Sequence, residues 1–411
     1  MPYWSPTGDG LANVDHQKTM RIAIFQLDVP LQSYSRDLAN ILAELGHSVT
    51  LCLTNASSPR LIDSASLRNV RVCMIDRPFP ILTKLYWKIT RHLQSMFAGL
   101  RLSVIDPQCR RMARKALNDK PDLLIGIEKR GLVIAGMLFD ELDVPFVYYS
   151  LELYIEGHPW YQDFCQLRRQ EIQYHRKALA TIVQDRFRAE VLMLANGNPR
   201  GCVVELPIGV RRLAKRIDPD LRTQLGIKQG SRMVLSLGSI AKHRLSEAIL
   251  DLSDRLDQGT TIILHGPTQD PRYRPRSRKN VIVSNKLLPE SELASLISLC
   301  DMGLVVYRND VVNDRLTAFS SQKVAYYLAL GKPIVTIDNE SYRHLFAEFA
   351  CGETFAQVED IPRAIEKVSA DYERYAKQAL AAFEKYYCLD NTIPLAINEI
   401  RACIQRRRPS L

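Results

Sequence analysis

The stretch from Ser320 to Asp338 constrains this chain most, because it predicts a helix followed at once by a buried strand. A serine pair suits the helix N-cap, and Gly331 followed by Pro333 is a helix stop signal. The apolar run Met302–Tyr307 predicts another buried strand just before the helix. A strand, a loop and a helix start in series form an anion site, because free N–H groups and the helix dipole converge there. Lys323, one turn into the helix, would add a positive charge; an ordinary βαβ unit with a solvated lysine is the alternative.

This segment resembles the donor-binding helix of GT-B glycosyltransferases of family 4, whose pattern is roughly S-P-x-K-x-x-E-Y-x-A-x-G-K-P-V-V. In that family an E-x7-E pair serves the donor: the second glutamate usually holds the ribose, and the first lies near the transferred sugar. The chain departs from the family at both positions, which are Ala318 and Tyr326. The residues that match are Ser320, Lys323, Tyr327, Ala329, Gly331, Lys332 and Pro333.

Length and composition favour a globular protein of two to three domains, since the chain has 411 residues and 46% hydrophobic residues. No apolar run is long enough to predict a transmembrane helix, and residues 1–19 lack the apolar centre of a signal peptide. The nine cysteines are scattered singly and form no C-x-x-C motif. They predict reduced, buried thiols in a cytoplasmic protein, and no metal site.

The formal charge of +10 favours an anionic partner: nucleic acid, anionic lipid or a phosphorylated small molecule. Residues 77–101 interleave basic residues with aliphatic and aromatic ones. Such a helix suits an anionic membrane surface, while a core helix with a solvated basic face is the alternative. Nucleic acid is not expected, because no recognised nucleic-acid module accompanies the charge. The residues proposed to contact acceptor or membrane are Lys84, Trp87, Lys88 and Arg91.

Short apolar runs alternate with amphipathic segments, which predicts an α/β protein. The opening βαβ unit over residues 21–53 also resembles the GT-B N-terminal domain, and its first loop lacks the G-x-G-x-x-G of a dinucleotide site. The resemblance implies two Rossmann-like domains facing each other across a cleft. The predicted divisions are a loose extension (1–19), an acceptor domain (20–207), a linker (208–230), a nucleotide-sugar domain (231–390) and a C-terminal helix returning to the first domain (391–411).

Several residues could take part in the reaction. In the family, a strand equivalent to residues 144–152 often ends in a histidine at the cleft, and Glu152 occupies that place. The predicted catalytic residues are Glu152, Glu128 and His158, and Glu156 and Asp28 are further groups that could activate an acceptor hydroxyl. For Lys242 and Arg244, a solvated pair at a helix start is the alternative to phosphate binding. The residues predicted to bind the donor are Gly238, Ser239, Lys242, Arg244, His265, Gly266, Leu288, Ser320, Ser321, Lys323 and Tyr326.

The resemblance implies transfer of a sugar from a nucleotide-sugar to a polysaccharide, glycolipid or lipid-linked acceptor at the cytoplasmic membrane face. A UDP-sugar is the expected donor, with no cofactor and no metal, since the helix start, Lys323, Lys242 and Arg244 could stabilise the leaving diphosphate. The protein is then cytoplasmic or peripheral on the inner face of the membrane. A non-catalytic binding subunit and a nucleotide-sugar epimerase are the alternatives. The sugar, the base, the acceptor, the stereochemistry and the oligomeric state stay open.

Overall fold

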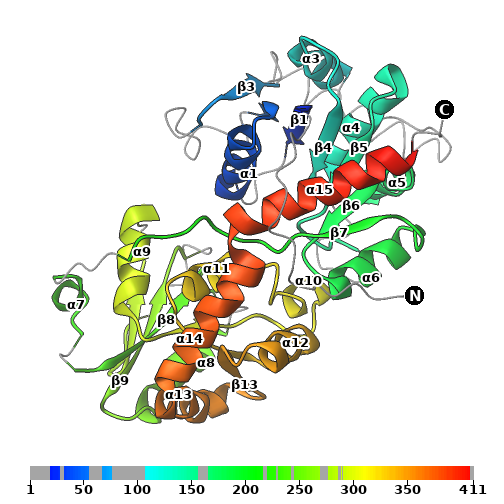
Figure 1. Ribbon diagram of the computed structural model, residues 1–411. Helices are drawn as coiled ribbons and strands as arrows, with labels where there is room; N and C mark the ends of the chain where they lie inside the picture. Colours follow the sequence, from blue (N-terminus) through cyan, green and yellow to red (C-terminus); the bar gives the residue numbers. More distant parts are fainter. Residues whose placement is uncertain are drawn as a thin grey trace.

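Two parallel sheets, one in each half of the chain, form the framework of the protein (Figure 1). The computed structural model describes residues 19–27, 32–54, 67–75, 107–155, 165–215, 220–227, 230–241, 245–268, 276–285, 288 and 290–407. Within these residues every strand pairing between the named strands is parallel. The sheets confirm the predicted α/β fold class with two Rossmann-like domains.

The N-terminal sheet is built from apolar runs buried on both faces, as parallel strands covered by helices require. Helices α1 (Gln32–Glu44), α3 (Pro107–Ala116), α4 (Glu128–Leu142), α5 (Cys165–His175) and α6 (Arg186–Ala195) belong to this domain. Among the described residues the strand order is β3 (Val70–Met74), β2 (Ser48–Leu53), β1 (Arg21–Gln26), β4 (Leu123–Ile127), β5 (Phe146–Tyr149), β6 (Ala180–Val183) and β7 (Val203–Glu205).

The C-terminal sheet has the same construction. Its described strands run in the order β10 (Val281–Ser284), β9 (Thr260–His265), β8 (Arg232–Leu237), β11 (Met302–Val305), β12 (Ile334–Ile337) and β13 (Gly352–Phe355). The helices of this half are α7 (Leu221–Gln224), α8 (Ser246–Leu250), α9 (Glu290–Leu299), α10 (Val312–Arg315), α11 (Gln322–Ala329), α12 (Glu340–Glu348), α13 (Ile361–Ala370) and α14 (Tyr372–Ala382).

Helix α11 is fixed to the centre of the C-terminal sheet by Tyr327. Its hydroxyl donates to the carbonyl of Leu235 at 2.6 Å and accepts from the backbone N–H of Leu237 at 3.0 Å, so it satisfies two groups of strand β8. The ring lies so close to Gly303 that a Cβ there would be 2.3 Å from it. The helix ends as predicted, with Gly331 at φ +66°. Tyr327 therefore sets where the start of α11 lies relative to the end of β8.

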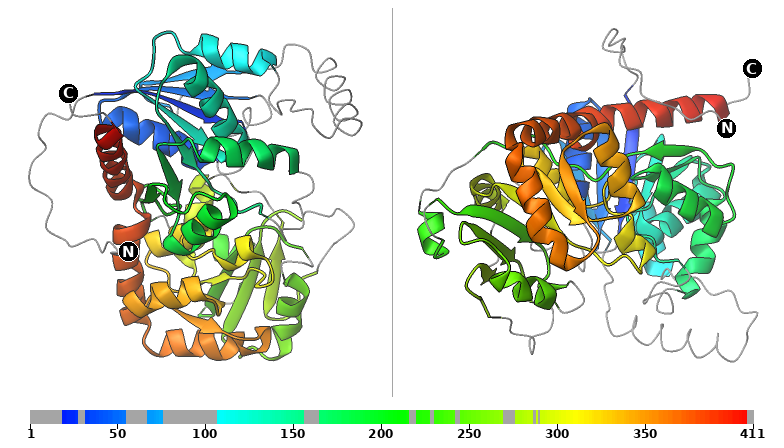
Figure 2. Two further views of the ribbon diagram at one scale, coloured as in Figure 1. Left: turned by 90° about the vertical axis from the view of Figure 1, so that its right-hand side faces the viewer. Right: turned by 90° about the horizontal axis from the view of Figure 1, so that it is seen from below.

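The chain returns to the N-terminal domain at its end. A π-helical turn (Phe383–Tyr387) follows α14 and leads into α15 (Leu389–Arg407). The apolar face of α15, including Ile393, Ile397 and Ile400, packs into the core cluster formed by α1 and the N-terminal strands. In the left view of Figure 2 the two lobes lie one above the other, and the C-terminal helices, orange to red, pass along one side of both. The domain boundaries expected from the sequence remain a prediction.

Several elements differ from the sequence-based expectation. The sequence predicts a strand over residues 122–128 and a loop over residues 28–35, whereas helix α4 starts at Glu128 and α1 starts at Gln32. The sequence also predicts a charged helix over roughly residues 162–180, where the structure has the shorter α5. Helix α7 lies inside the predicted linker, residues 208–230. Strands β3 and β13 were not predicted. The basic segment 77–101 lies outside the described residues.

Candidate functional site

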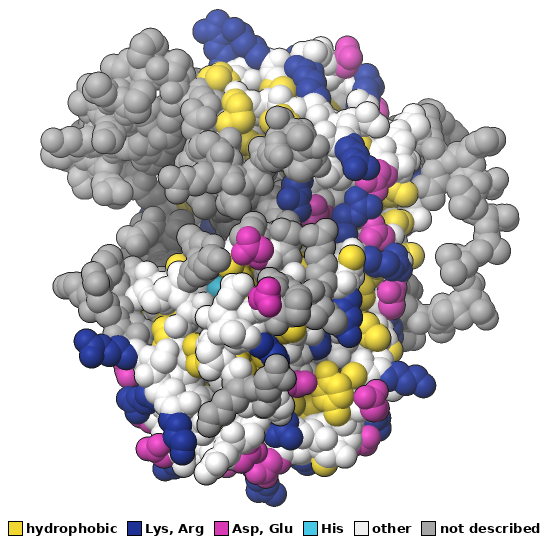
Figure 3. All heavy atoms as spheres, turned by 90° about the vertical axis from the view of Figure 1, so that its left-hand side faces the viewer, with side chains coloured by type: hydrophobic (Ala, Val, Ile, Leu, Met, Phe, Trp, Pro, Cys, Tyr) yellow, Lys and Arg dark blue, Asp and Glu magenta, His cyan; other side chains and the backbone are white. Residues whose placement is uncertain are grey.

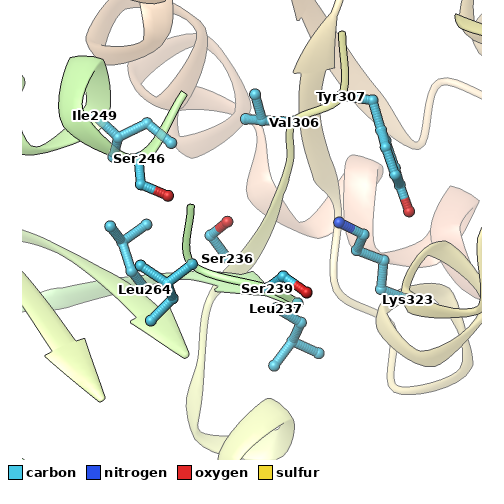
Figure 4. Close-up of a pocket in the computed structure, with 11 residues that line it drawn as sticks. Ser236, Leu237, Ser239, Ser246, Ile249, Leu264, Val306, Tyr307 and Lys323 are labelled. Carbon is cyan, nitrogen blue, oxygen red and sulfur yellow. The ribbon is translucent and has the colours of Figure 1, made fainter. Parts of the chain in front are cut away.

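A cavity of about 160 Å³ opens at the C-terminal ends of strands β8 and β11. Ligands of open parallel sheets bind at this edge, where loops diverge from the strand ends. Figure 4 shows the serine hydroxyls of the β8 loop on one side and Lys323 beside the Tyr307 ring on the other. The lining residues are Ser236, Leu237, Gly238, Ser239, Ile240, Ser246, Ile249, Leu264, Val306, Tyr307 and Lys323.

Two glycines shape the wall of this cavity. Gly238 has φ +119° and Gly266 has φ +146°, conformations that side chains rarely adopt. A Cβ at Gly266 would lie 2.2 Å from the Gly238 carbonyl oxygen, so only glycine allows the two loops to approach. Beside them, His265 Nδ1 is 3.0 Å from Ser284 Oγ, and burial lowers the pKa of His265, which keeps the ring neutral near pH 7. The predicted donor residues Gly238, Ser239, His265 and Gly266 thus lie together.

Lys323 supplies a positive charge to the cavity. Its Nζ lies 4.1 Å from the centroid of the Tyr307 ring, and a Cβ on Gly238 would be 3.4 Å from that Nζ. The ring face attracts the ammonium group, which holds the charge near the glycine loop. The Tyr307 hydroxyl oxygen lies 2.9 Å from Ser321 Oγ. Lys323 was predicted from the sequence and Tyr307 was not; the one signal for Tyr307 is its place at the end of an apolar run.

The start of α11 has no side-chain cap. The N-cap is Ser321, whose side chain makes no capping hydrogen bond because its hydroxyl pairs with Tyr307. Ser320 is one residue further out: its Oγ donates to the Leu316 carbonyl at 2.9 Å and accepts from Arg188 at 3.1 Å. N–H groups in the first turn of a helix have no partner within the helix and are the usual ligands of phosphate oxygens.

Two predicted catalytic carboxylates lie at the C-terminal edge of the N-terminal sheet. Glu128, only 3% exposed, has φ +60°, an uncommon conformation for a non-glycine residue. Its Oε1 accepts from the backbone N–H of Leu151 at 2.6 Å and of Glu152 at 2.8 Å, so it orders the chain around the second carboxylate. Glu152 is half-buried, and its Oε2 accepts from Asn313 Nδ2 at 2.6 Å. The geometry makes Glu128 a support and leaves Glu152 as the more accessible carboxylate.

The remaining predicted residues fall into two groups. Tyr326 is 9% exposed and belongs to the apolar core of the C-terminal domain, against which Leu288 packs. The other residues lie outside the part of the chain that the structure describes: Asp28, Lys84, Trp87, Lys88, Arg91, Glu156, His158, Lys242 and Arg244.

Within the described residues, no group of three or more His, Cys, Asp or Glu side chains is arranged to hold a metal ion. Among the described helices, none combines the length and the apolar character needed to cross a membrane.

Known proteins share the fold of this chain, and part of its second half matches a protein family. Residues 242–393 match a family described as glycosyl transferase-like. A search of curated protein sequences finds no match. Among solved structures, Anabaena HepE in complex with UDP-glucose matches with a TM-score of 0.65 at 14% identity, covering 94% of this chain and 100% of HepE. Sucrose-phosphate synthase from Thermosynechococcus elongatus gives the same values. A glycosyltransferase from Rickettsia africae has a TM-score of 0.64 at 10% identity, with 94% and 99% covered.

These findings define the fold. The chain has the two-domain GT-B fold, and its second domain matches a glycosyl transferase-like family. The resemblance seen in the segment around Lys323 is thereby confirmed.

Proposed function

We propose that the protein is a glycosyltransferase that takes a sugar from a nucleotide-sugar donor. The observation that carries this proposal is the cavity where the Lys323 ammonium, the Gly238 loop and the start of α11 meet. A lysine, a glycine loop and a helix N-terminus together suit a diphosphate. Lys323 and the start of α11 lie within residues 242–393, which match the glycosyl transferase-like family, and the Gly238 loop comes just before them.

The leaving group of such a reaction is a nucleoside diphosphate whose negative charge grows as the bond to the sugar breaks. Lys323 and the first turn of α11 would stabilise that charge without a metal. In an inverting reaction, Glu152 would remove the proton from the acceptor hydroxyl as it attacks. In a retaining reaction, stabilisation of the leaving group would matter more than any side-chain base. Glu128 would serve either course by ordering the backbone of Glu152.

For the donor we propose a UDP-sugar, supported by the fold shared with HepE, which was solved with UDP-glucose. For the acceptor we propose a glycan or lipid-linked sugar at the cytoplasmic membrane face. The support is the basic segment 77–101 together with α3, whose exposed face carries Arg110, Arg111, Arg114 and Lys115. Over the described atoms of the face in Figure 3, Lys and Arg are interspersed with Asp and Glu, so the charge is not gathered there.

A non-catalytic nucleotide-binding subunit is the second candidate. It is favoured by the two positions where the family has glutamates: Ala318 is fully buried and Tyr326 nearly so, both within the apolar core. Neither side chain can offer a carboxylate to the donor. Under this alternative the protein would bind the nucleotide without turning over any nucleotide-sugar.

A thermal unfolding series tests the proposal. The protein is mixed in turn with UDP, GDP, ADP and CDP, each as its sodium salt without added metal. A ligand at 100 times its dissociation constant adds about 2.7 kcal/mol to the free energy of unfolding. We expect UDP to raise the unfolding temperature most. If none of the four raises it, the proposed nucleotide site is wrong. A shift with UDP, but no release of UDP from any UDP-sugar given with acceptor glycans, would favour the non-catalytic subunit.

A further inference from the structure

Arg188, near the start of α6, occupies the boundary between the two domains. It belongs to the N-terminal domain and is 1% exposed, and among the described residues its guanidinium donates only to neutral oxygens. Nη2 donates to the Leu151 carbonyl at 2.7 Å and to Asn313 Oδ1 at 3.0 Å. Nη1 donates to the Leu316 carbonyl at 3.0 Å, to Ser320 Oγ at 3.1 Å and to the Asn313 carbonyl at 3.4 Å. One side chain thus joins Leu151 of the first domain to the segment before α11.

The segment that Arg188 contacts, residues 311–321, follows strand β11 of the second domain but packs on the first. Leu316 lies within a core cluster of N-terminal residues, and the backbone N–H of Ile208 donates to the Phe319 carbonyl at 2.8 Å. One residue into α11, Gln322 Nε2 donates to Ser33 Oγ of the first domain at 3.2 Å. The start of α11 is therefore attached to the N-terminal domain on two sides.

Asn313 extends the same network to Glu152, the carboxylate proposed to act on the acceptor. Its Oδ1 accepts from Arg188 and from the backbone N–H of Leu153 at 2.8 Å, and its Nδ2 donates to Glu152. The amide thus uses both of its polar atoms between the domains. The proposed acceptor-side carboxylate and the proposed phosphate-binding turn are consequently held by two adjoining side chains, Asn313 and Arg188.

The buried positive charge of Arg188 favours a bound anion near this network. A buried cation is costly unless an anion lies near it, and Arg188 Nε has no hydrogen-bond partner among the described residues. Burial lowers the pKa of Arg188, and the carboxylates of Glu152 and Asp185 oppose that effect without bonding to the guanidinium. A diphosphate at the first turn of α11 would add a further, compensating anion close to Ser320.

We propose that Arg188 is a positioning residue for the donor: it holds the first turn of α11 so that the diphosphate is bound when the two domains are closed on each other. This inference rests on the proposed function. Arg188 does not line the cavity, so its effect would pass through Ser320 and Asn313. A lysine at this place has a single charged group and cannot reach the same set of acceptors, because it lacks the planar fork of arginine.

The test compares UDP with uridine, which lacks the diphosphate, by calorimetric titration. In the variant Arg188→Lys we expect the dissociation constant of UDP to rise on the order of tenfold. The N-terminus of α11 stabilises the diphosphate only when its first turn is correctly positioned relative to the nucleotide. The affinity for uridine should stay within about twofold, because uridine has no phosphate to meet α11. The matched control is Arg186→Lys, two residues earlier on the same helix, where the arginine is exposed; it should leave both affinities unchanged.

Each outcome decides the inference. A selective loss of UDP affinity supports it, whereas equal loss for UDP and uridine would make Arg188 a merely structural residue and overturn it. Unchanged UDP affinity overturns it as well. If Arg188→Lys does not fold, Asn313→Ala is measured instead and must show the same selective loss, although smaller. If the wild-type protein binds neither UDP nor uridine, the proposed function itself fails and the inference falls with it, which is a result distinct from the others.

Discussion

Removing the charge of Lys323 should abolish most of the affinity for UDP. The variant Lys323→Met keeps the length and apolar stem of the side chain but loses the ammonium group, which lies 4.1 Å from the Tyr307 ring and next to Gly238. A hydrogen bond from a charged donor contributes about 1.5–3 kcal/mol, which corresponds to about a 10- to 150-fold rise in the dissociation constant of UDP. The lost contact with Tyr307 should cost the fold only about 0.5–1 kcal/mol, so the variant stays folded.

The assay is calorimetric titration of UDP into wild-type protein, Lys323→Met and Lys323→Arg, with thermal unfolding as the check of folding. Lys323→Arg keeps a positive charge and should lose less affinity than Lys323→Met. An unchanged dissociation constant in a folded Lys323→Met protein would refute the reasoning, because it would show that the ammonium group does not meet the diphosphate.

Three further results are expected. Burial raises the pKa of Asp185 from its ordinary 3.8 to about 6, because the folded state favours the protonated carboxyl. The stabilisation of the folded state by this protonation is therefore complete below pH 3.8 and is lost as the pH rises through 6. Asp185→Asn keeps the N-cap acceptor and should therefore be more stable than wild type by up to about 3 kcal/mol at pH 8, and equally stable near pH 3.5. Chemical denaturation at the two pH values measures this, and the same difference in unfolding free energy at both would contradict it. Tyr326→Phe should raise the dissociation constant of UDP by about two- to fivefold if its hydroxyl meets the ribose, and no change by titration would confine Tyr326 to packing. The protein should sediment with vesicles of anionic lipid at low salt and be released at high salt; equal sedimentation with neutral vesicles would exclude an electrostatic membrane contact.

Much of the fold could be predicted because each central strand is a short apolar run with a turn signal nearby. Gly331 and Pro333 marked the end of α11, and the structure has the helix end at Ala329 with Leu330 as its C-cap. The missed strands are both at a sheet edge. Strand β3 alternates Val70, Arg71 and Val72 with little burial, so it offers no apolar run, and β13 has four residues beginning at Gly352.

The site could be predicted only where its residues are close in the sequence. Lys323 and the serine pair follow from the helix signals, and Gly238 follows from the end of its strand. Arg188 and Asn313 could not be found in this way, because their contact joins residues 125 positions apart, in different domains. Glu128 was expected to end the strand over residues 122–128, but it is the first residue of α4 and has a positive φ. Its carboxylate accepts a hydrogen bond from the backbone N–H of Glu152. A glutamate at this position gives no sequence signal for such a turn.

The most direct test of the whole account is a crystal structure of the protein with UDP bound. The account predicts that the diphosphate lies at the start of α11, with a phosphate oxygen within hydrogen-bond distance of Lys323 Nζ and of the backbone between Gly238 and Ser239. UDP bound at another place, with the cavity between β8 and β11 left empty, would contradict it.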